Sequence, residues 1–206
     1  MEEPSPTRTS EPTATATPVP AGVPILSQTD YQSSTSYRRL VGEVMNNTGG
    51  NVKFVKIIAT FYDAAGSVSG TDFGYTSIDI LTPGQKSPFT VLYEATAAHA
   101  SYRLQVQWRA TSDQPIGGIT ILSSGERDSS TSYRRIFGEV RNDSGGPLRF
   151  VKIIATIYDA SGRVVGDEFG YAALDDLPAG QTSPFEILVE KRGGVRYELQ
   201  TQGRRP

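Results

Sequence analysis

The sequence predicts an all-β protein: two tandem immunoglobulin- or fibronectin-III-like β-sandwich domains after a disordered N-terminal tail. Three observations support this fold class: an internal duplication, a hydrophobic period of two inside each copy, and a low-complexity start. The predicted organisation is a tail over residues 1–22, a first sandwich over 23–111, a linker over 112–118 and a second sandwich over 119–206.

The predicted tail, residues 1–22, consists almost entirely of Pro, Thr, Ser, Ala and Glu. Such a stretch has too little apolar surface to offset the entropy lost when its backbone is ordered, so we expect it to be disordered. Its prolines favour an extended spacer. A stalk that holds the domains away from a surface and a dispensable tail are equally compatible with this composition.

The duplication fixes the size of the folding unit. Residues 35–94 and 131–190 align without a gap, and about 36 of these 60 positions are identical. The offset of 96 residues is too long for a solenoid repeat and fits a whole domain. The longest identical block, Phe54–Thr60, recurs as Phe150–Thr156. Residues 112–118 are polar and contain Pro and Gly, which is typical of a linker.

Within each copy, apolar and polar side chains alternate with the period of a half-buried strand. One face of the central strand of the first copy carries Val55, Ile57, Ala59 and Phe61. The stretch Asn46–Gly50 is rich in residues that tolerate positive φ and predicts a hairpin turn. About seven strands per copy are expected, near residues 23–28, 37–45, 52–62, 67–70, 73–79, 87–94 and 101–108 in the first.

Composition excludes several classes of function. The chain has no cysteine, which excludes disulfides, thiolate nucleophiles and cysteine-based metal sites. Its only histidine, His99, is expected in an exposed loop and cannot supply a repeated catalytic or metal-binding histidine. Charges are balanced, with 20 Lys and Arg against 22 Asp and Glu, so no nucleic-acid partner is expected. We expect no cofactor, no metal ion and no enzymatic activity.

Each copy resembles the FxLYD domain family of bacterial and archaeal proteins over most of its length. The first copy carries the resemblance on Gly42-Glu43-Val44, Asn46, Ala59-Thr60-Phe61-Tyr62-Asp63, Gly66, Leu81, Pro83-Gly84-Gln85 and Pro88-Phe89. The second carries it on Gly138-Glu139-Val140, Asn142, Ala155-Thr156-Ile157-Tyr158-Asp159, Gly162, Leu177, Gly180-Gln181 and Pro184-Phe185. Ala59 and Ala155 stand where the family has Phe. The resemblance implies an immunoglobulin-like sandwich and transfers no catalytic or ligand-binding residue.

The resemblance also implies a location. Such domains often belong to exported or membrane-anchored proteins, and the Thr/Pro tail is similar to the segment that follows the anchor cysteine of a lipoprotein. We therefore expect an extracytoplasmic protein, either a cell-surface lipoprotein or a secreted one. Membrane contact is expected only through a lipid anchor that precedes the given sequence.

Two short motifs, each present in both copies, are the candidate partner-binding residues. The first is a Tyr-Arg-Arg run, chosen because Tyr and Arg are enriched in interface hot spots, with a cation–π contact at a strand edge as the alternative. The second is a Phe-Gly-Tyr segment near a chain bend, where aromatic side chains can bind a partner or pack in the core. The candidates are Tyr37, Arg38, Arg39, Phe73, Tyr75, Tyr133, Arg134, Arg135, Phe169 and Tyr171.

Two further patterns have simpler interpretations. Asn46 and Asn142 begin N-glycosylation patterns, yet both lie in the repeated turn, where Asn is favoured for backbone reasons. Glu43 and Lys56, repeated in the second copy, are interpreted as a solvated cross-strand charge pair rather than a catalytic acid and base.

The sequence therefore predicts a non-enzymatic extracytoplasmic binding, interaction or spacer module whose ligand is unknown. The expected partner is a protein or a surface polymer, and duplication raises avidity when both copies engage together. The alternative is a structural subunit of a surface assembly or filament, a homo-oligomer paired through strand edges or the tail.

Overall fold

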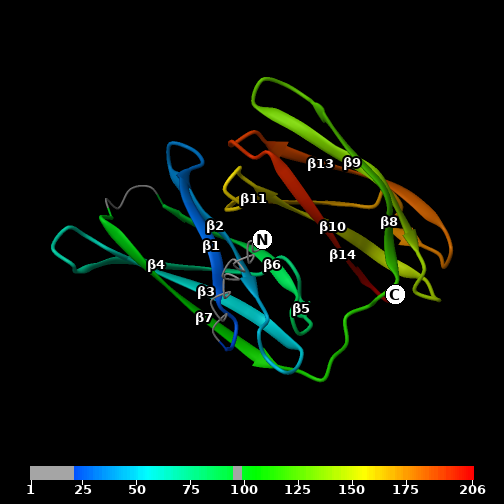
Figure 1. The fold of residues 1–206 in the computed structure, drawn as a ribbon, viewed down its shortest axis with the longest axis horizontal. Helices are drawn as coiled ribbons and strands as arrows, with labels where there is room; N and C mark the ends of the chain where they lie inside the picture. The colour runs from blue at the N-terminus through cyan, green and yellow to red at the C-terminus, as the bar shows by residue number, and fades with distance from the viewer. Residues whose placement is uncertain (1–20, 95–98) are drawn as a thin grey trace, which may run out of the picture.

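A computed structural model describes residues 21–94 and 99–206, so nearly all of the predicted disordered tail lies outside the described residues. As predicted, the described part of the chain forms two β-sandwich domains and contains no helix (Figure 1). The first domain holds β1 (Ile25–Gln32), β2 (Tyr37–Met45), β3 (Val52–Tyr62), β4 (Val68–Tyr75), β5 (Ile80–Leu81), β6 (Lys86–Glu94) and β7 (Ser101–Ala110). The second holds β8 (Ile119–Asp128), β9 (Tyr133–Asn142), β10 (Leu148–Tyr158), β11 (Val164–Tyr171), β12 (Asp176–Leu177), β13 (Thr182–Glu190) and β14 (Arg196–Arg204).

Both domains have the same immunoglobulin-like topology. In the first, the three-stranded sheet β1-β2-β6 faces a four-stranded sheet in which β3 pairs with β4, β5 and β7. In the second, β8-β9-β13 faces a sheet in which β10 pairs with β11, β12 and β14. We call the outward surface of each three-stranded sheet its three-strand face and that of each four-stranded sheet its four-strand face.

The core of each domain lies between its two sheets, where the predicted alternation is confirmed. Val55, Ile57, Ala59 and Phe61 are all buried, and they pack with Leu40 and other apolar side chains of the opposite sheet. Burying a Val, Ile or Phe side chain stabilises the folded state by about 1.5–3 kcal/mol. The second domain repeats this core around Ile136, Ile153 and Ile187.

The predicted hairpin at Asn46–Gly50 is wrong, because β2 and β3 belong to different sheets and the turn crosses between them. The buried Asn46 side chain explains the crossing: its amide donates to the carbonyls of Gly50 at 2.9 Å and Leu81 at 2.8 Å. Asn142 does the same in the second domain. These buried amides support the interpretation of both residues as turn formers rather than glycan carriers.

Three smaller expectations also need correction. The predicted strands 67–70 and 73–79 are replaced by one continuous strand, β4, and the short β5. Glu43 and Lys56 do not pair across strands, since their strands lie in different sheets, and the Glu43 carboxylate instead contacts Lys86 Nζ at 3.3 Å. His99 is not exposed, because its ring packs against Phe61 and Tyr93.

The two domains stack on each other (Figure 1). The three-strand face of the first domain covers the four-strand face of the second, with β11 crossing β1, β2 and β6. Val41, Tyr158 and Val164 form a buried apolar cluster at this contact, and Tyr31 packs against them. The four sheets therefore lie in successive layers. This order leaves the four-strand face of the first domain and the three-strand face of the second at opposite ends of the stack.

Candidate functional site

The four-strand face of the first domain begins at a β-bulge. Lys53 pairs with Arg109 and Lys56 with Gln107, so two residues of β3 face one residue of β7. A bulge of this kind re-aims a side chain. Phe54 adopts a left-handed backbone with φ of 52°, which is rare for a bulky residue, and its ring is 58% exposed on the outer surface. Phe150 repeats this conformation in the second domain with φ of 49°.

Two further rings project from the edge strand β4 onto the same face. Phe73 and Tyr75 are about half exposed, and their ring centroids are 6.0 Å apart in an edge-to-face arrangement. Lys56 Nζ lies 3.7 Å from the Phe73 centroid, within cation–π range. Phe169 and Tyr171 repeat the exposed pair in the second domain. The alternative that these rings pack in the core is therefore wrong.

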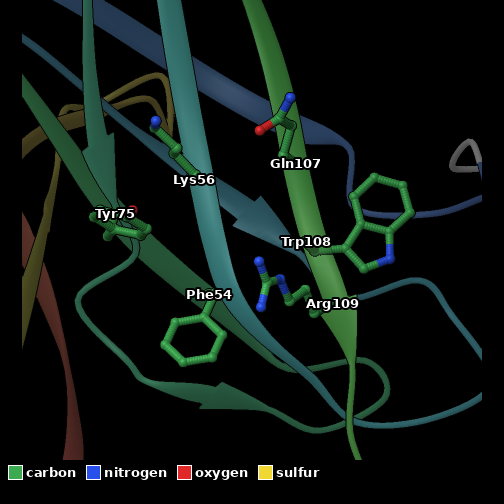
Figure 2. A pocket seen from close by; sticks show the side chains of 6 residues that line it. All are labelled: Phe54, Lys56, Tyr75, Gln107, Trp108 and Arg109. Atoms are coloured by element: carbon green, nitrogen blue, oxygen red, sulfur yellow. The ribbon is translucent and has the colours of Figure 1, made fainter.

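A shallow groove of 660 Å³ runs along this face (Figure 2). Its polar lining is Lys56, Gln107 and Arg109, and the Arg109 guanidinium lies 5.8 Å from the Phe54 ring centroid. Figure 2 shows that the Trp108 ring projects away from Phe54 and the other groove side chains. It packs over the backbone of Gly22 instead, where an added Cβ would be 3.1 Å from the indole.

The same polar groups are already engaged in the second domain. Lys152 Nζ donates to the carbonyl of Ser77 at 3.1 Å. Gln202 Oε1 accepts from the backbone N–H of Asp79 at 2.7 Å, and the Arg204 guanidinium contacts the Asp79 carboxylate at 3.3 Å. These three side chains align with Lys56, Gln107 and Arg109. These three side chains of the second domain thus bind one loop of the first domain, at the carbonyl of Ser77 and at the N–H and carboxylate of Asp79.

The apolar part of the occupied face lies farther along β10 and β11. Tyr158 is 2% exposed, and its hydroxyl donates to Glu43 at 2.6 Å. Val164 is fully buried beside it. The residue of the first domain that aligns with Val164 is Val68, which is 63% exposed. Identical side chains are thus covered in one copy of the face and uncovered in the other.

Charged groups complete the occupied face. Asp167 accepts hydrogen bonds from Ser77 Oγ at 3.0 and 2.8 Å and from Thr90 Oγ1 at 3.4 Å. Glu168 forms an ion pair with Arg39 at 3.3 Å. Burial raises the pKa of both carboxyl groups, while the hydroxyl donors and Arg39 lower it.

The Tyr-Arg-Arg run of the first copy lies on β2, in the other sheet from Phe73 and Tyr75. Arg38 is held within its own domain by Asp30, 3.0 Å away. Arg39 reaches the second domain, where it meets Glu168. Tyr37 is 43% exposed at the start of the strand. The structure therefore spreads the first motif over three environments and does not join it to the aromatic pair.

The second copy of this motif is also spread over three environments, but all its described ion pairs lie within its own domain. Arg134 is buried and pairs with Glu126 at 3.1 Å, as Arg38 pairs with the aligned acid in the first domain. Arg135 forms an ion pair with Glu186 on the free three-strand face. Tyr133 remains 41% exposed.

Sequence reasoning missed Phe54, Tyr62 and Tyr158, whose side chains project from the four-strand faces of the two domains. A signal for Phe54 was present, because it shares its strand parity with the polar Lys56 and an aromatic ring there must face outward. No signal marked Tyr158 over Tyr62, since the two are identical residues in equivalent positions.

Because Phe54 has a left-handed backbone, we expect glycine to be a more stable replacement than alanine at this position, the reverse of the usual order in a strand. A left-handed backbone costs a non-glycine residue roughly 1–2 kcal/mol. We therefore expect Phe54→Gly to be more stable than Phe54→Ala by about 1 kcal/mol, as measured by urea unfolding. At Ile58, on the same strand, Ala should be the more stable replacement by about 0.5–1 kcal/mol. If the stability difference between the Gly and Ala variants were the same at positions 54 and 58, a left-handed backbone at Phe54 would be contradicted.

The buried carboxyl group of Asp167 is expected to make the stability of the folded chain depend on pH. Burial raises the pKa of its carboxyl above the ordinary 3.8, so the folded chain holds this proton more tightly than the unfolded chain. The stability contributed by the group therefore falls as pH rises from the ordinary pKa through the raised one. We expect Asp167→Asn, which still accepts from Ser77, to remove this fall. Urea midpoints from about pH 3 to about pH 7 test it, and a wild-type minus variant difference that rises with pH would contradict it.

Among the described residues, no helix is long and apolar enough to cross a bilayer. In the same ranges, no group of three or more His, Asp or Glu side chains is placed to hold a metal ion.

No protein-family model and no curated protein sequence matches the chain. Among solved structures, it is similar to an exo-chitosanase of Amycolatopsis orientalis, with 14% identity, a TM-score of 0.30, and coverage of 86% of this chain and 25% of that one. It is also similar to β-glucuronidase 2 of Bacteroides uniformis, with 13% identity, a TM-score of 0.29, and coverage of 82% and 26%. The chain spans about a quarter of the length of these enzymes, and the likeness concerns the β-sandwich fold alone.

Proposed function

We propose that this chain is a non-enzymatic, extracytoplasmic interaction module whose first domain binds a protein through its four-strand face. One observation carries the proposal: the second domain already uses the equivalent residues to bind a protein surface, that of the first domain. Eight residues of the occupied face recur unchanged on the free one, which carries Lys56, Ile58, Thr60, Tyr62, Val68, Gln105, Gln107 and Arg109.

The chemistry of the free face supports a polypeptide partner. In the second domain, Lys152 and Gln202 satisfy a backbone carbonyl and a backbone N–H of one loop. A polypeptide presents these two groups at every ordinary residue, whereas a polysaccharide without amide groups presents neither. The exposed aromatic rings and Arg109 add the residue types enriched in interface hot spots.

The absence of a catalytic arrangement in the groove supports a non-enzymatic role. Its lining combines aromatic rings with Lys56, Gln107 and Arg109, and none of the six lining residues is a carboxylate or a histidine. Lysine and tyrosine can also act as a general base or a nucleophile, but among these six residues no carboxylate or histidine lies beside Lys56 or Tyr75 to activate them. The FxLYD resemblance and the Thr/Pro tail support the extracytoplasmic location.

A photo-crosslinking amino acid placed at Tyr62 tests the protein partner. In cells of the source organism, we expect the full chain to form adducts whose crosslinked partner yields peptides on digestion, as identified by mass spectrometry. The matched control carries the same amino acid at Val195, which is comparably exposed to Val68 and lies outside both free faces. Adducts that yield no partner peptides and lose their added mass to glycosidases would replace the protein by a surface polysaccharide. Equal labelling at both positions would overturn the assignment of the face.

A further inference from the structure

We infer that the four-strand face of the first domain binds a second copy of this chain, at the three-strand face of that copy's second domain. The inference rests on the proposed function and names its partner. It follows from the stacking inside the chain, because the three-strand face of the first domain, together with the loop between β4 and β5, covers the four-strand face of the second. One face of each kind is left uncovered at the two ends of the same molecule.

The uncovered three-strand face keeps the groups that receive the second domain inside the chain. Glu43, which accepts from Tyr158, recurs as the exposed Glu139. Val41 is fully buried at the interdomain contact, whereas the aligned Phe137 is 37% exposed. The residues common to both three-strand faces and their connecting loops are Ser27, Arg39, Glu43, Asp79 and Gln85, which recur as Ser123, Arg135, Glu139, Asp175 and Gln181.

These conserved groups give specific partners for the free four-strand face. Within the chain, Arg204 meets Asp79 and Tyr158 meets Glu43. The aligned groups between two copies are Arg109 with Asp175 and Tyr62 with Glu139. The ion pair between Arg39 and Glu168 likewise becomes one between Arg135 and Asp72, with the sign of each charge retained. These three side-chain contacts of the occupied face thus have aligned partners on the two free faces, whereas the contact between Ser77 and Asp167 does not, because Ala173 aligns with Ser77.

One pair of positions that differ between the copies changes in a compensating way. Inside the chain, the carboxylate of Asp167 on the four-strand face accepts from the hydroxyl of Thr90 on the three-strand face. On the free faces, Thr71 aligns with Asp167 and Glu186 aligns with Thr90. Hydroxyl and carboxylate have exchanged sides, so a hydroxyl can again donate to a carboxylate, here Glu186, which also pairs with Arg127 and Arg135 in its own domain. A substitution on one face alone would have placed two carboxylates or two hydroxyls opposite each other.

The resulting contact joins unlike faces and is heterologous. Such a contact produces a closed ring when the rotation between copies closes and an open filament when it does not. Two identical faces do not meet in either case. This property separates the inference from an ordinary two-fold dimer and decides the design of its test.

Two face-blocking variants test the inference with the full-length chain. Val68→Arg blocks the four-strand face of the first domain, and Phe137→Arg blocks the three-strand face of the second. Wild-type protein should form species larger than a monomer in sedimentation velocity between roughly 1 µM and roughly 1 mM, the range in which untethered contacts of this kind act. Each variant alone should stay monomeric. An equimolar mixture should give a 1:1 dimer and nothing larger, because only one intact face of each kind remains.

Val195→Arg is the matched control, because it places the same charge at an exposed valine outside both faces. It should associate like wild type, and circular dichroism checks that all variants are folded.

Three results would overturn the inference: monomeric wild type over this range, continued association of either single variant, or no dimer in the mixture. The crosslinking experiment separates this failure from failure of the proposed function. A protein adduct at Tyr62 with a partner of another mass would retain a protein-binding face and reject self-association. Adducts whose partner yields no peptides would reject both.

Discussion

Replacing Tyr158 with alanine is expected to uncouple the two domains. Its ring is 2% exposed between Val41 and Val164, and truncating a buried aromatic side chain costs about 3–5 kcal/mol. The loss also removes the hydroxyl donor of Glu43, a buried carboxylate that retains the partly exposed Lys86. Each domain keeps most of its own core, so we expect the thermal transition to split into two in calorimetry.

The matched control for this substitution is Tyr62→Ala, at the equivalent position of the uncovered face. That ring is only partly buried, so we expect a smaller stability loss and a single transition. Tyr158→Phe separates the ring from the hydroxyl: it keeps the packing and should cost about 1–3 kcal/mol, because the buried Glu43 carboxylate loses one donor and keeps only Lys86. Burial and the two neighbouring carboxylates raise the pKa of Tyr158, so the hydroxyl stays protonated and able to donate across the neutral range. Equal losses for Tyr158→Ala and Tyr62→Ala would contradict a stabilising interface.

Gly42→Ala is expected to cost more than about 3 kcal/mol or to prevent the first domain from folding. A Cβ at this position would collide with the carbonyl of Ser27 and lie 2.5 Å from Phe89 Cζ. Neither neighbour is free to move. The Ser27 carbonyl belongs to the backbone of β1, where Ser27 pairs with Glu43 of β2, and the Phe89 ring is fully buried. Trp108, the only tryptophan, lies in the first domain and reports its unfolding by fluorescence.

Gly49→Ala provides the control, since no atom lies within 4 Å of its added Cβ. We expect a change within about 0.5 kcal/mol in urea unfolding. A Gly42→Ala midpoint equal to that of Gly49→Ala would show that β1 and Phe89 yield without cost, contrary to the close packing of this sheet.

The sequence predicted the features that depend on local periodicity and missed those that depend on which sheet a strand joins. Alternation correctly placed Val55 and Ile57 in the core because a buried sandwich strand must turn every second side chain inward. The Asn46 turn has the composition of a hairpin but crosses between sheets, because its buried amide bonds to Leu81, 35 residues away. No local pattern contains that contact.

The candidate site was predictable only in part, for a related reason. The exposed pair of Phe73 and Tyr75 was marked by its repetition, but the edge position of β4 that exposes it is a property of the assembled sheet. The contact between the domains was not predictable at all from the duplicated residues. Tyr62 and Tyr158 are the same residue in the same motif, and only the stacking of the domains distinguishes them.

The identity of the two central strands has a consequence for how the chain reaches its native state. Phe54–Thr60 in β3 and Phe150–Thr156 in β10 are the same seven residues, and the edge strands beside them share Phe-Gly-Tyr. After dilution from denaturant, either strand can therefore pair with the neighbours of the other at nearly equal energy. Such exchanged pairings are kinetic traps typical of tandem domains. Synthesis from the N-terminus limits them, because the first domain can close its sheets before the second copy of the strand has left the ribosome.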